Sequence, residues 1–170
     1  MPPSDYVRRL RAQIGHELIM LQAVTVMVFD DERRLLVALD RHSGLWMTIG
    51  GAIEPDETPA DAAVRECWEE TGLIITPTKL LAVLGGPKYR ITYNNGDVVS
   101  YTTALFEAQI VGGVAQADGE EAVALRFVSQ AEAIELPMGE WTKELVSIAF
   151  GQHDKPYFAP ASWTPPDGTL

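Results

Sequence analysis

The sequence predicts an α+β fold in which a mixed, curved β-sheet lies between helices. Apolar runs with strand character recur along the chain, and turn sequences join several of them as hairpins. One amphipathic helix, expected over residues 58–70, lies among these strands. The chain of 170 residues is long enough to bury one full hydrophobic core. We therefore expect a single domain over residues 1–150 and a C-terminal tail over residues 151–170.

The part of the chain before the amphipathic helix is expected to form one short helix and three strands. Tyr6, Leu10 and Ile14 recur at the spacing of one helix face, which favours a helix over residues 5–13. The apolar runs that follow are separated by turn residues, as strands are. These strands are expected over residues 21–29, 34–39 and 45–49.

The amphipathic helix has clear start and stop signals. Thr58 is a good N-cap residue, Pro59 suits the first helical position, and Asp61 follows three residues after Thr58. Gly72 suits the left-handed conformation that closes many helices. These signals predict a helix that begins after Thr58 and ends at about residue 70.

The chain after this helix returns to strand-like runs. The sequence Asn-Asn-Gly-Asp at residues 94–97 favours a tight hairpin turn between two of them. The expected strands span residues 79–85, 88–93, 98–110 and 122–128. Two helical segments are expected over residues 131–135 and 140–150. Residues 151–170 contain four prolines and little periodicity, which predicts an extended tail that is either mobile or laid against another surface.

The composition excludes several classes of function. The formal net charge is −11 and there is no basic stripe, so we expect no stable nucleic-acid binding. No apolar run is long enough to span a membrane, and no signal peptide is visible. Cys67 is the only cysteine, which excludes an intramolecular disulfide and a cysteine-rich zinc site. A cytoplasmic location is the simplest interpretation.

Three glutamates share one face of the predicted helix. Glu66, Glu69 and Glu70 stand at positions i, i+3 and i+4, so their carboxylates lie together and repel one another. A helical wheel places an apolar face opposite, formed by Ala60, Val64, Cys67 and Trp68, with the acidic face pointing away from the core. A divalent cation would remove the repulsion, and hard oxygen ligands suit Mg²⁺ or Mn²⁺. Taken alone, the pattern is also consistent with a solvated acidic face.

The residues around this helix have a specific spacing. Gly51 is followed after five residues by Glu57, and after seven more by the run Arg65-Glu66-Cys67-Trp68-Glu69-Glu70-Thr71-Gly72-Leu73. This arrangement resembles the Nudix box: Gly, five residues, Glu, seven residues, Arg-Glu, an aliphatic residue, any residue, Glu-Glu, any residue, Gly and an aliphatic residue. Every fixed position matches. Cys67 replaces the first aliphatic residue, and Ile49 stands where relatives usually have a proline before the two glycines.

The resemblance implies an α/β/α sandwich with a strand–loop–helix–loop site. It also implies a divalent-metal-dependent hydrolase of nucleoside diphosphates linked to another moiety, such as ADP-ribose or a dinucleoside polyphosphate. Carried over by position, the metal ligands would be the carbonyl of Gly50 and the side chains of Glu66, Glu69 and Glu70. Glu66 would also be the general base. Arg65 would orient carboxylates, and Glu57 would pair with Arg65 to brace the loop and leave the helical glutamates free for metal.

A further carboxylate is expected near the end of the sheet. In many relatives a glutamate on a loop there supplies another metal ligand or the base. Glu120 and Glu121 are the candidates, and Glu120 is preferred. The alternative interpretation is an exposed acidic turn after Asp118-Gly119.

The substrate is less well determined. A proline some way past the box marks many ADP-ribose hydrolases, and a tyrosine slightly further on marks many diadenosine polyphosphate hydrolases. Here Pro87 and Tyr89 give conflicting signals. Trp46, Gly51, Tyr89 and Tyr101 are the candidate substrate contacts, although strands favour tyrosine for packing as well.

Two other functions stay open. One is a housekeeping pyrophosphohydrolase of non-standard or oxidised nucleoside triphosphates. The other is a nucleotide-sensing domain without turnover, although such proteins often lose box glutamates that are retained here. Isomerase chemistry on this fold needs a reactive cysteine outside the helix core, which Cys67 is not expected to be. Residues 151–170 and the N-terminal helix lie outside the minimal domain, so we also expect that they could form a homodimer contact.

Overall fold

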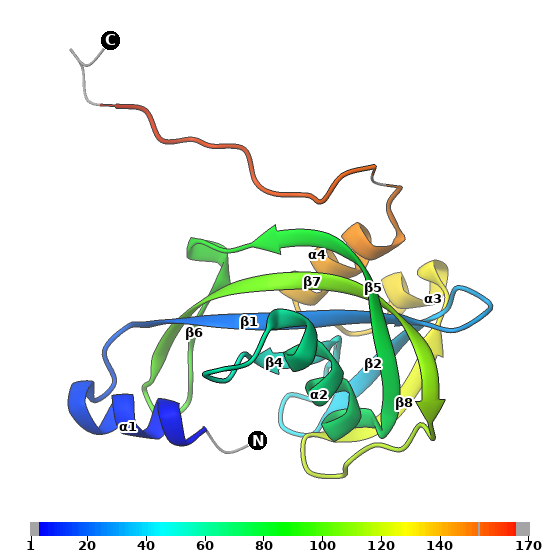
Figure 1. Cartoon of the computed structure of the whole chain (residues 1–170), viewed down its shortest axis with the longest axis horizontal. Helices are drawn as coiled ribbons and strands as arrows, with labels where there is room; N and C mark the ends of the chain where they lie inside the picture. The colour runs from blue at the N-terminus through cyan, green and yellow to red at the C-terminus, as the bar shows by residue number, and fades with distance from the viewer. Residues whose placement is uncertain (1–3, 153, 166–170) are drawn as a thin grey trace.

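The computed structural model describes residues 4–152 and 154–165. Within these residues the strands form one open, mixed sheet, with α2 against one face and α3 and α4 against the other (Figure 1). The helices are α1 (Asp5–Ile14), α2 (Pro59–Thr71), α3 (Gln130–Glu135) and α4 (Glu140–Phe150), with a 3₁₀ turn η1 at Pro87–Tyr89. The strands are β1 (Ile19–Phe29), β2 (Leu35–Asp40), β3 (Trp46–Met47), β4 (Ile49–Ala52), β5 (Leu73–Leu84), β6 (Arg90–Thr92), β7 (Val98–Gly113) and β8 (Ala122–Val128). The predicted α+β fold with a mixed sheet between helices is confirmed.

The centre of the sheet is the parallel pair β1 and β7. Their register runs from Ile19 opposite Val99 to Phe29 opposite Gln109. β5 and β2 extend the sheet on either side as antiparallel neighbours, in the order β3-β2-β1-β7-β5. The short strand β4 also pairs with β1, placing Gly51 opposite Val24. The two glycines that precede the helix are therefore held on the central strand of the sheet.

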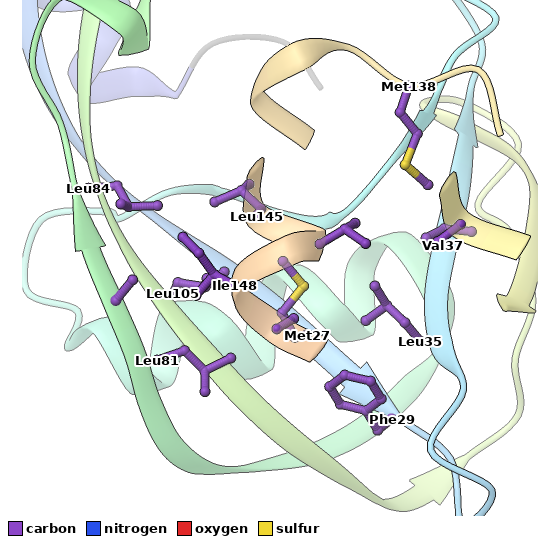
Figure 2. Close-up of a cluster of buried hydrophobic side chains, with 14 of the residues drawn as sticks. Met27, Phe29, Leu35, Val37, Leu81, Leu84, Leu105, Met138, Leu145 and Ile148 are labelled. Carbon is purple, nitrogen blue, oxygen red and sulfur yellow. The ribbon is translucent and has the colours of Figure 1, made fainter. Parts of the chain in front are cut away.

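Each face of the sheet has its own core, because successive side chains of a strand point to opposite faces. On β1, Val24, Val26 and Val28 join the cluster under α2, whereas Met27 and Phe29 join the cluster under α3 and α4. Figure 2 shows the second cluster, in which Met27 and Phe29 meet side chains from β2, β5 and α4. The molecule is thus a sandwich with α2 on one side and the C-terminal helices on the other.

Most predicted elements are present, and three differ in extent. The strand expected at residues 79–85 begins instead at Leu73, directly after α2, and passes Pro77 and two further irregularities in its pairing with β7. The run expected as a strand at 88–93 begins with the 3₁₀ turn, because Gly86 and Pro87 start a turn before β6. The run expected at 45–49 divides into β3 and β4.

The helical wheel for α2 was right about Cys67 and Val64, which pack inward, and wrong about Trp68. Ala62, Ala63 and Cys67 are buried, but Trp68 is 59 % exposed. Glu66 and Glu70 are buried on the same side as the alanines. The small alanine side chains let the helix approach the sheet closely, so the packed face includes two of the three carboxylates. The acidic face therefore does not point away from the core as expected.

The two ends of the chain lie outside the sandwich. No residue of α1 is buried. In the tail, Tyr157 forms a parallel bridge with Ala82 on β5, and the tail then runs away from the sheet (Figure 1). The expected extended tail is thus laid against β5 at one point; its residues 153 and 166–170 lie outside the described residues. Among the residues that the structure describes, no helix is long and apolar enough to cross a membrane.

Polar contacts attach α1 to the hairpin between β6 and β7. Arg11 donates from Nη1 to the carbonyl of Glu17 at 2.6 Å and from Nη2 to that of Val98 at 3.0 Å. Asp97 lies 3.3 Å from Nε of Arg11 and 2.8 Å from Nδ1 of His16. The hydrogen bond from His16 is the main cause that lowers the pKa of Asp97, so this carboxylate is charged and pairs with both groups.

We predict that Asp97→Asn loosens the attachment of α1 without unfolding the sandwich. Replacing the carboxylate removes the charge that Arg11 and His16 share, whereas the apolar core does not contact this residue. Hydrogen exchange measured by mass spectrometry should show faster exchange in residues 5–14 and unchanged exchange in β1 and β7. The control is Glu140→Gln, which removes an exposed charge on α4; exchange in α1 as slow in Asp97→Asn as in this control would contradict the prediction.

Candidate active site

The box residues come together where α2 lies across β4. The loop at residues 53–58 connects the two elements. The ends of α2 are fixed as the sequence predicts. Thr58 accepts a hydrogen bond from the backbone N–H of Asp61 at 3.2 Å, and Gly72 closes the helix in the left-handed conformation. Local signals therefore set where α2 begins and ends.

Arg65 connects the separate parts of this region by hydrogen bonds. Its Nε and Nη2 donate to the two oxygens of Glu57, at 2.8 and 2.9 Å, so the pair is bidentate. Nη2 also donates to the carbonyl of Ala52 at 3.0 Å. Nη1 donates to Glu66 at 2.8 Å and to Glu69 at 3.0 Å. One guanidinium thus joins the end of β4, the loop and the helix.

The expected pair between Glu57 and Arg65 is therefore present. The expectation that this pair leaves the helical glutamates free is wrong, because Arg65 has a third nitrogen directed at the helix. That nitrogen binds Glu66 and Glu69 together. In this conformation Arg65 supplies the positive charge that separates the two carboxylates.

Burial and pairing shift the pKa values of these carboxylates in opposite directions. The hydrogen bonds from Arg65 lower the pKa of Glu57, and the same contacts raise the pKa of Arg65. For Glu66, which is 6 % exposed, loss of solvent outweighs the contact with Arg65 and raises the pKa. Burial raises the pKa of Glu70 to about 8. The site therefore contains two carboxylates that lack sufficient positive charge nearby.

Both glycines of β4 lie where other atoms approach their backbone closely. A Cβ atom on Gly51 would lie 2.4 Å from Oε1 of Glu66. A Cβ atom on Gly50, which has a φ of 150°, would lie 2.2 Å from the carbonyl oxygen of Val24. The missing side chains thus leave the space that the Glu66 carboxylate and the β1 backbone occupy.

Glu70 lies on the other side of these glycines. Its Oε1 accepts a hydrogen bond from the N–H of Gly50 at 3.0 Å. It also lines a small cavity of about 50 Å³, together with Gly50, Asp40 and Glu121. Glu120 is exposed and does not line this cavity. The structure therefore brings Glu121, rather than the preferred Glu120, beside the box.

The turn before β8 explains this placement. The carboxylate of Asp118 accepts hydrogen bonds from the backbone N–H groups of Glu120, Glu121 and Ala122. This turn presents Glu121, the last residue before the strand, to the inside. The sequence signal that favours Glu121 is its position directly before β8, where the sheet fixes the backbone. A role for either glutamate stays a prediction.

The donor chemistry of the site suits a hard divalent cation. Glu66, Glu69 and Glu70 offer carboxylate oxygens, and Gly50 adds a backbone carbonyl. Within the described ranges, no three side chains of His, Cys, Asp or Glu converge closely enough to hold a metal ion in this conformation. Three hydrogen bonds hold the carboxylates in other directions: Glu66 and Glu69 turn to Arg65, and Glu70 turns to the N–H of Gly50. The chemical types of these residues suit a metal ion, which could bind if Glu66 and Glu69 released Nη1 of Arg65.

The candidate aromatic contacts lie on the α4 side of the sheet. Tyr89 is 3 % exposed, packs edge-on against Trp141 with 5.0 Å between ring centroids, and donates to Glu144 at 3.0 Å. Trp46 and Tyr101 are partly buried against the same cluster. These contacts explain why Tyr89 is buried. Substrate contact by Trp46, Tyr89 and Tyr101 stays a prediction.

Comparison with known proteins adds an independent finding. A family model described as NUDIX domain matches residues 20–147. A Bacillus subtilis (strain 168) protein whose name proposes an 8-oxo-dGTP diphosphatase is 32 % identical over 108 residues, covering 64 % of this chain and 66 % of that protein. The human protein named diphosphoinositol polyphosphate phosphohydrolase 3-alpha is 40 % identical over 63 residues, covering 35 % and 38 %. Each match spans less than two thirds of the curated relative.

A solved structure supports the fold. The crystal structure of a UDP-X diphosphatase aligns with a TM-score of 0.63 and 22 % identity, over 88 % of this chain and 70 % of that one. At this identity the similarity establishes the arrangement of the sheet and helices alone.

We predict that Gly51→Ala moves the Glu66 carboxylate without unfolding the protein. The new methyl group meets the end of a side chain rather than backbone, so the change should alter the melting temperature little while it displaces a proposed ligand. Affinity for Mn²⁺, measured by titration calorimetry, should fall about 10-fold or more, as when a neighbour of a metal ligand is altered. The matched control is Gly139→Ala, where a Cβ atom meets nothing within 4 Å. Equal Mn²⁺ affinity in both variants would disprove the role of this close approach.

Proposed function

Because the chain belongs to the Nudix family, we propose that it is a divalent-metal-dependent hydrolase. The bond cleaved would be the phosphoanhydride of a nucleoside diphosphate linked to another moiety, such as ADP-ribose or a dinucleoside polyphosphate. The observation that carries the proposal is the network in which Arg65 joins Glu57 to Glu66 and Glu69. This network places an array of carboxylates beside a backbone that is free of side chains at Gly50 and Gly51.

Mg²⁺, or Mn²⁺ in its place, would be held by Glu66, Glu69, Glu70 and the carbonyl of Gly50. When bound, such an ion lowers the pKa of the attacking water and offsets the negative charge that develops on the phosphate oxygens. The conformational change on binding would be small, because Glu66 and Glu69 would only replace their contact with Nη1 of Arg65 by a contact with the ion. Glu57 keeps the other two nitrogens and holds the loop in place.

Glu66 is the proposed general base. Its carboxylate lies against the backbone of Gly51 and is shielded from solvent, which limits it to a narrow range of positions. A carboxylate held in this way is already oriented to accept a proton from the attacking water. Arg65 and Glu57 are positioning residues, because they act on the reaction through Glu66, Glu69 and the loop.

The favoured substrate class has one competitor. The Bacillus subtilis relative supports a second candidate function, the hydrolysis of oxidised or other non-standard nucleoside triphosphates to monophosphate and pyrophosphate. The favoured function would yield two monophosphates from a substrate such as ADP-ribose. A panel of ADP-ribose, dinucleoside polyphosphates, NADH, nucleotide sugars and triphosphates with Mg²⁺ or Mn²⁺ would separate the two by their products.

We predict that Glu66→Gln and Glu69→Gln each lower kcat on the best substrate of this panel by at least about 100-fold, the usual effect of losing a general base or a metal ligand. The fold should persist, because glutamine keeps the size of the side chain and a hydrogen-bonding oxygen. Circular dichroism measures the fold, and chromatographic separation of the nucleotide products measures turnover. Glu135→Gln, an exposed change on α3, is the control. Near-normal turnover in both box variants would rule out the mechanism.

We also predict that Glu121→Gln lowers turnover more than Glu120→Gln. Glu121 lines the cavity next to Glu70, whereas Glu120 is exposed. The pair is its own matched control, since the two residues are adjacent and chemically identical. Steady-state kinetics on the same substrate would decide between them, and a larger loss in Glu120→Gln would reverse the assignment.

A further inference from the structure

An apolar groove lies on the α2 side of the sheet, where the helix does not cover the first residues of β1. Its cavity has a volume of about 330 Å³, and its main lining residues are Met20, Gln22, Ile53, Pro59, Val83 and Thr102. We call it the β1 groove. None of its lining residues is charged, although the chain carries a net charge of −11. Met20 is 77 % exposed and Val83 is 45 % exposed.

The tail presents a second set of uncovered apolar side chains. After the bridge at Tyr157, Phe158 is 71 % exposed and Trp163 is 77 % exposed. Residues 156–165 contain no charged side chain. Two large aromatic side chains on a neutral segment and a neutral groove with exposed apolar walls are chemically matched surfaces.

The tail does not reach the groove of its own chain. The N–H of Tyr157 donates to Leu81 at 2.8 Å, and the N–H of Val83 donates to Tyr157 at 3.0 Å, which fixes the tail parallel to β5 at the rim of the groove. Pro160 and Pro165 favour an extended chain from there on, without a reversal. The tail therefore leads outward from the sheet (Figure 1).

We propose that two copies of this chain exchange tails, so that residues 158–163 of each copy dock in the β1 groove of the other. Phe158 and Trp163 are the anchors, and Met20 and Val83 form the walls that they cover. The contact joins two neutral surfaces, so it brings together two acidic molecules without placing carboxylates opposite each other.

The area available approaches that of a stable interface. Each aromatic side chain buries about 150–250 Å² when it is fully covered. Two tails supply four such side chains, about 600–1,000 Å² in all, and the exposed parts of Met20 and Val83 in each groove add to this area. The two equivalent contacts together approach the lower end of the range of about 1,200–2,000 Å² that is typical of stable interfaces. A two-fold arrangement of this kind closes on itself and does not form chains of molecules.

Sedimentation velocity of the full chain at tens of micromolar tests the proposal. The unmodified chain should be a dimer. Met20→Glu in the groove, and separately Trp163→Ser in the tail, should raise the dimer dissociation constant by about 30-fold or more, the effect of losing a central aromatic contact. Ile134→Ser changes an equally exposed apolar residue on α3 and should leave the dimer intact. A monomeric unmodified chain, or a dimer that neither variant weakens, overturns the proposal.

Disulfide trapping distinguishes exchange between copies from folding back within one copy. Gln22→Cys and Ser162→Cys would be made on separate chains and mixed with oxidised glutathione, which takes up the two electrons. The expected product is a disulfide that joins one chain of each variant. Cys67 is buried and does not compete. A chain that carries both new cysteines and closes only upon itself overturns the proposal, as does a yield equal to that from Gln22→Cys mixed with Ala131→Cys.

Discussion

The site depends on one physical constraint, which is that the packed face of α2 contains two carboxylates. Glu66 and Glu70 are 6 % and 8 % exposed, and a buried carboxylate without a partner costs several kcal/mol. The fold meets this cost with a nitrogen of Arg65 for Glu66 and the N–H of Gly50 for Glu70. Both partners are groups that a cation could replace. Burial of these two carboxylates thus lowers the stability of the fold, and it also favours binding of a divalent ion at α2.

This constraint extends into the sheet. A side chain at position 51 would meet the Glu66 carboxylate, and one at position 50 would meet the backbone of β1, on which β4 lies with Gly51 opposite Val24. β1 in turn is fixed by its long parallel pairing with β7. The central strands therefore position the site, although they contribute no catalytic side chain of their own. Helix caps at Thr58 and Gly72 complete the arrangement by fixing where α2 begins and ends.

The sequence predicts the parts of this structure that local signals determine. Thr58, Pro59 and Gly72 fix both ends of α2, and the fixed spacing of the box identifies its glutamates. A helical wheel shows which residues share a face, but only the sheet decides which face is covered, so Trp68 was placed inside and proved exposed. The first half of β5 was missed because Pro77 disfavours a strand, and its pairing with β7 overrides that local preference. The choice between Glu120 and Glu121 likewise depends on a turn that alternation alone does not reveal.

Cys67 gives the molecule an internal reporter of its own folding. The thiol is fully buried under α2, and burial raises its pKa to about 11, so the reactive thiolate is scarce near neutral pH. Since it is the only cysteine, modification of the native chain by a thiol reagent must wait until α2 leaves the sheet. The rate of labelling therefore measures how often the helix that carries the carboxylates opens, at a single position and without an introduced probe.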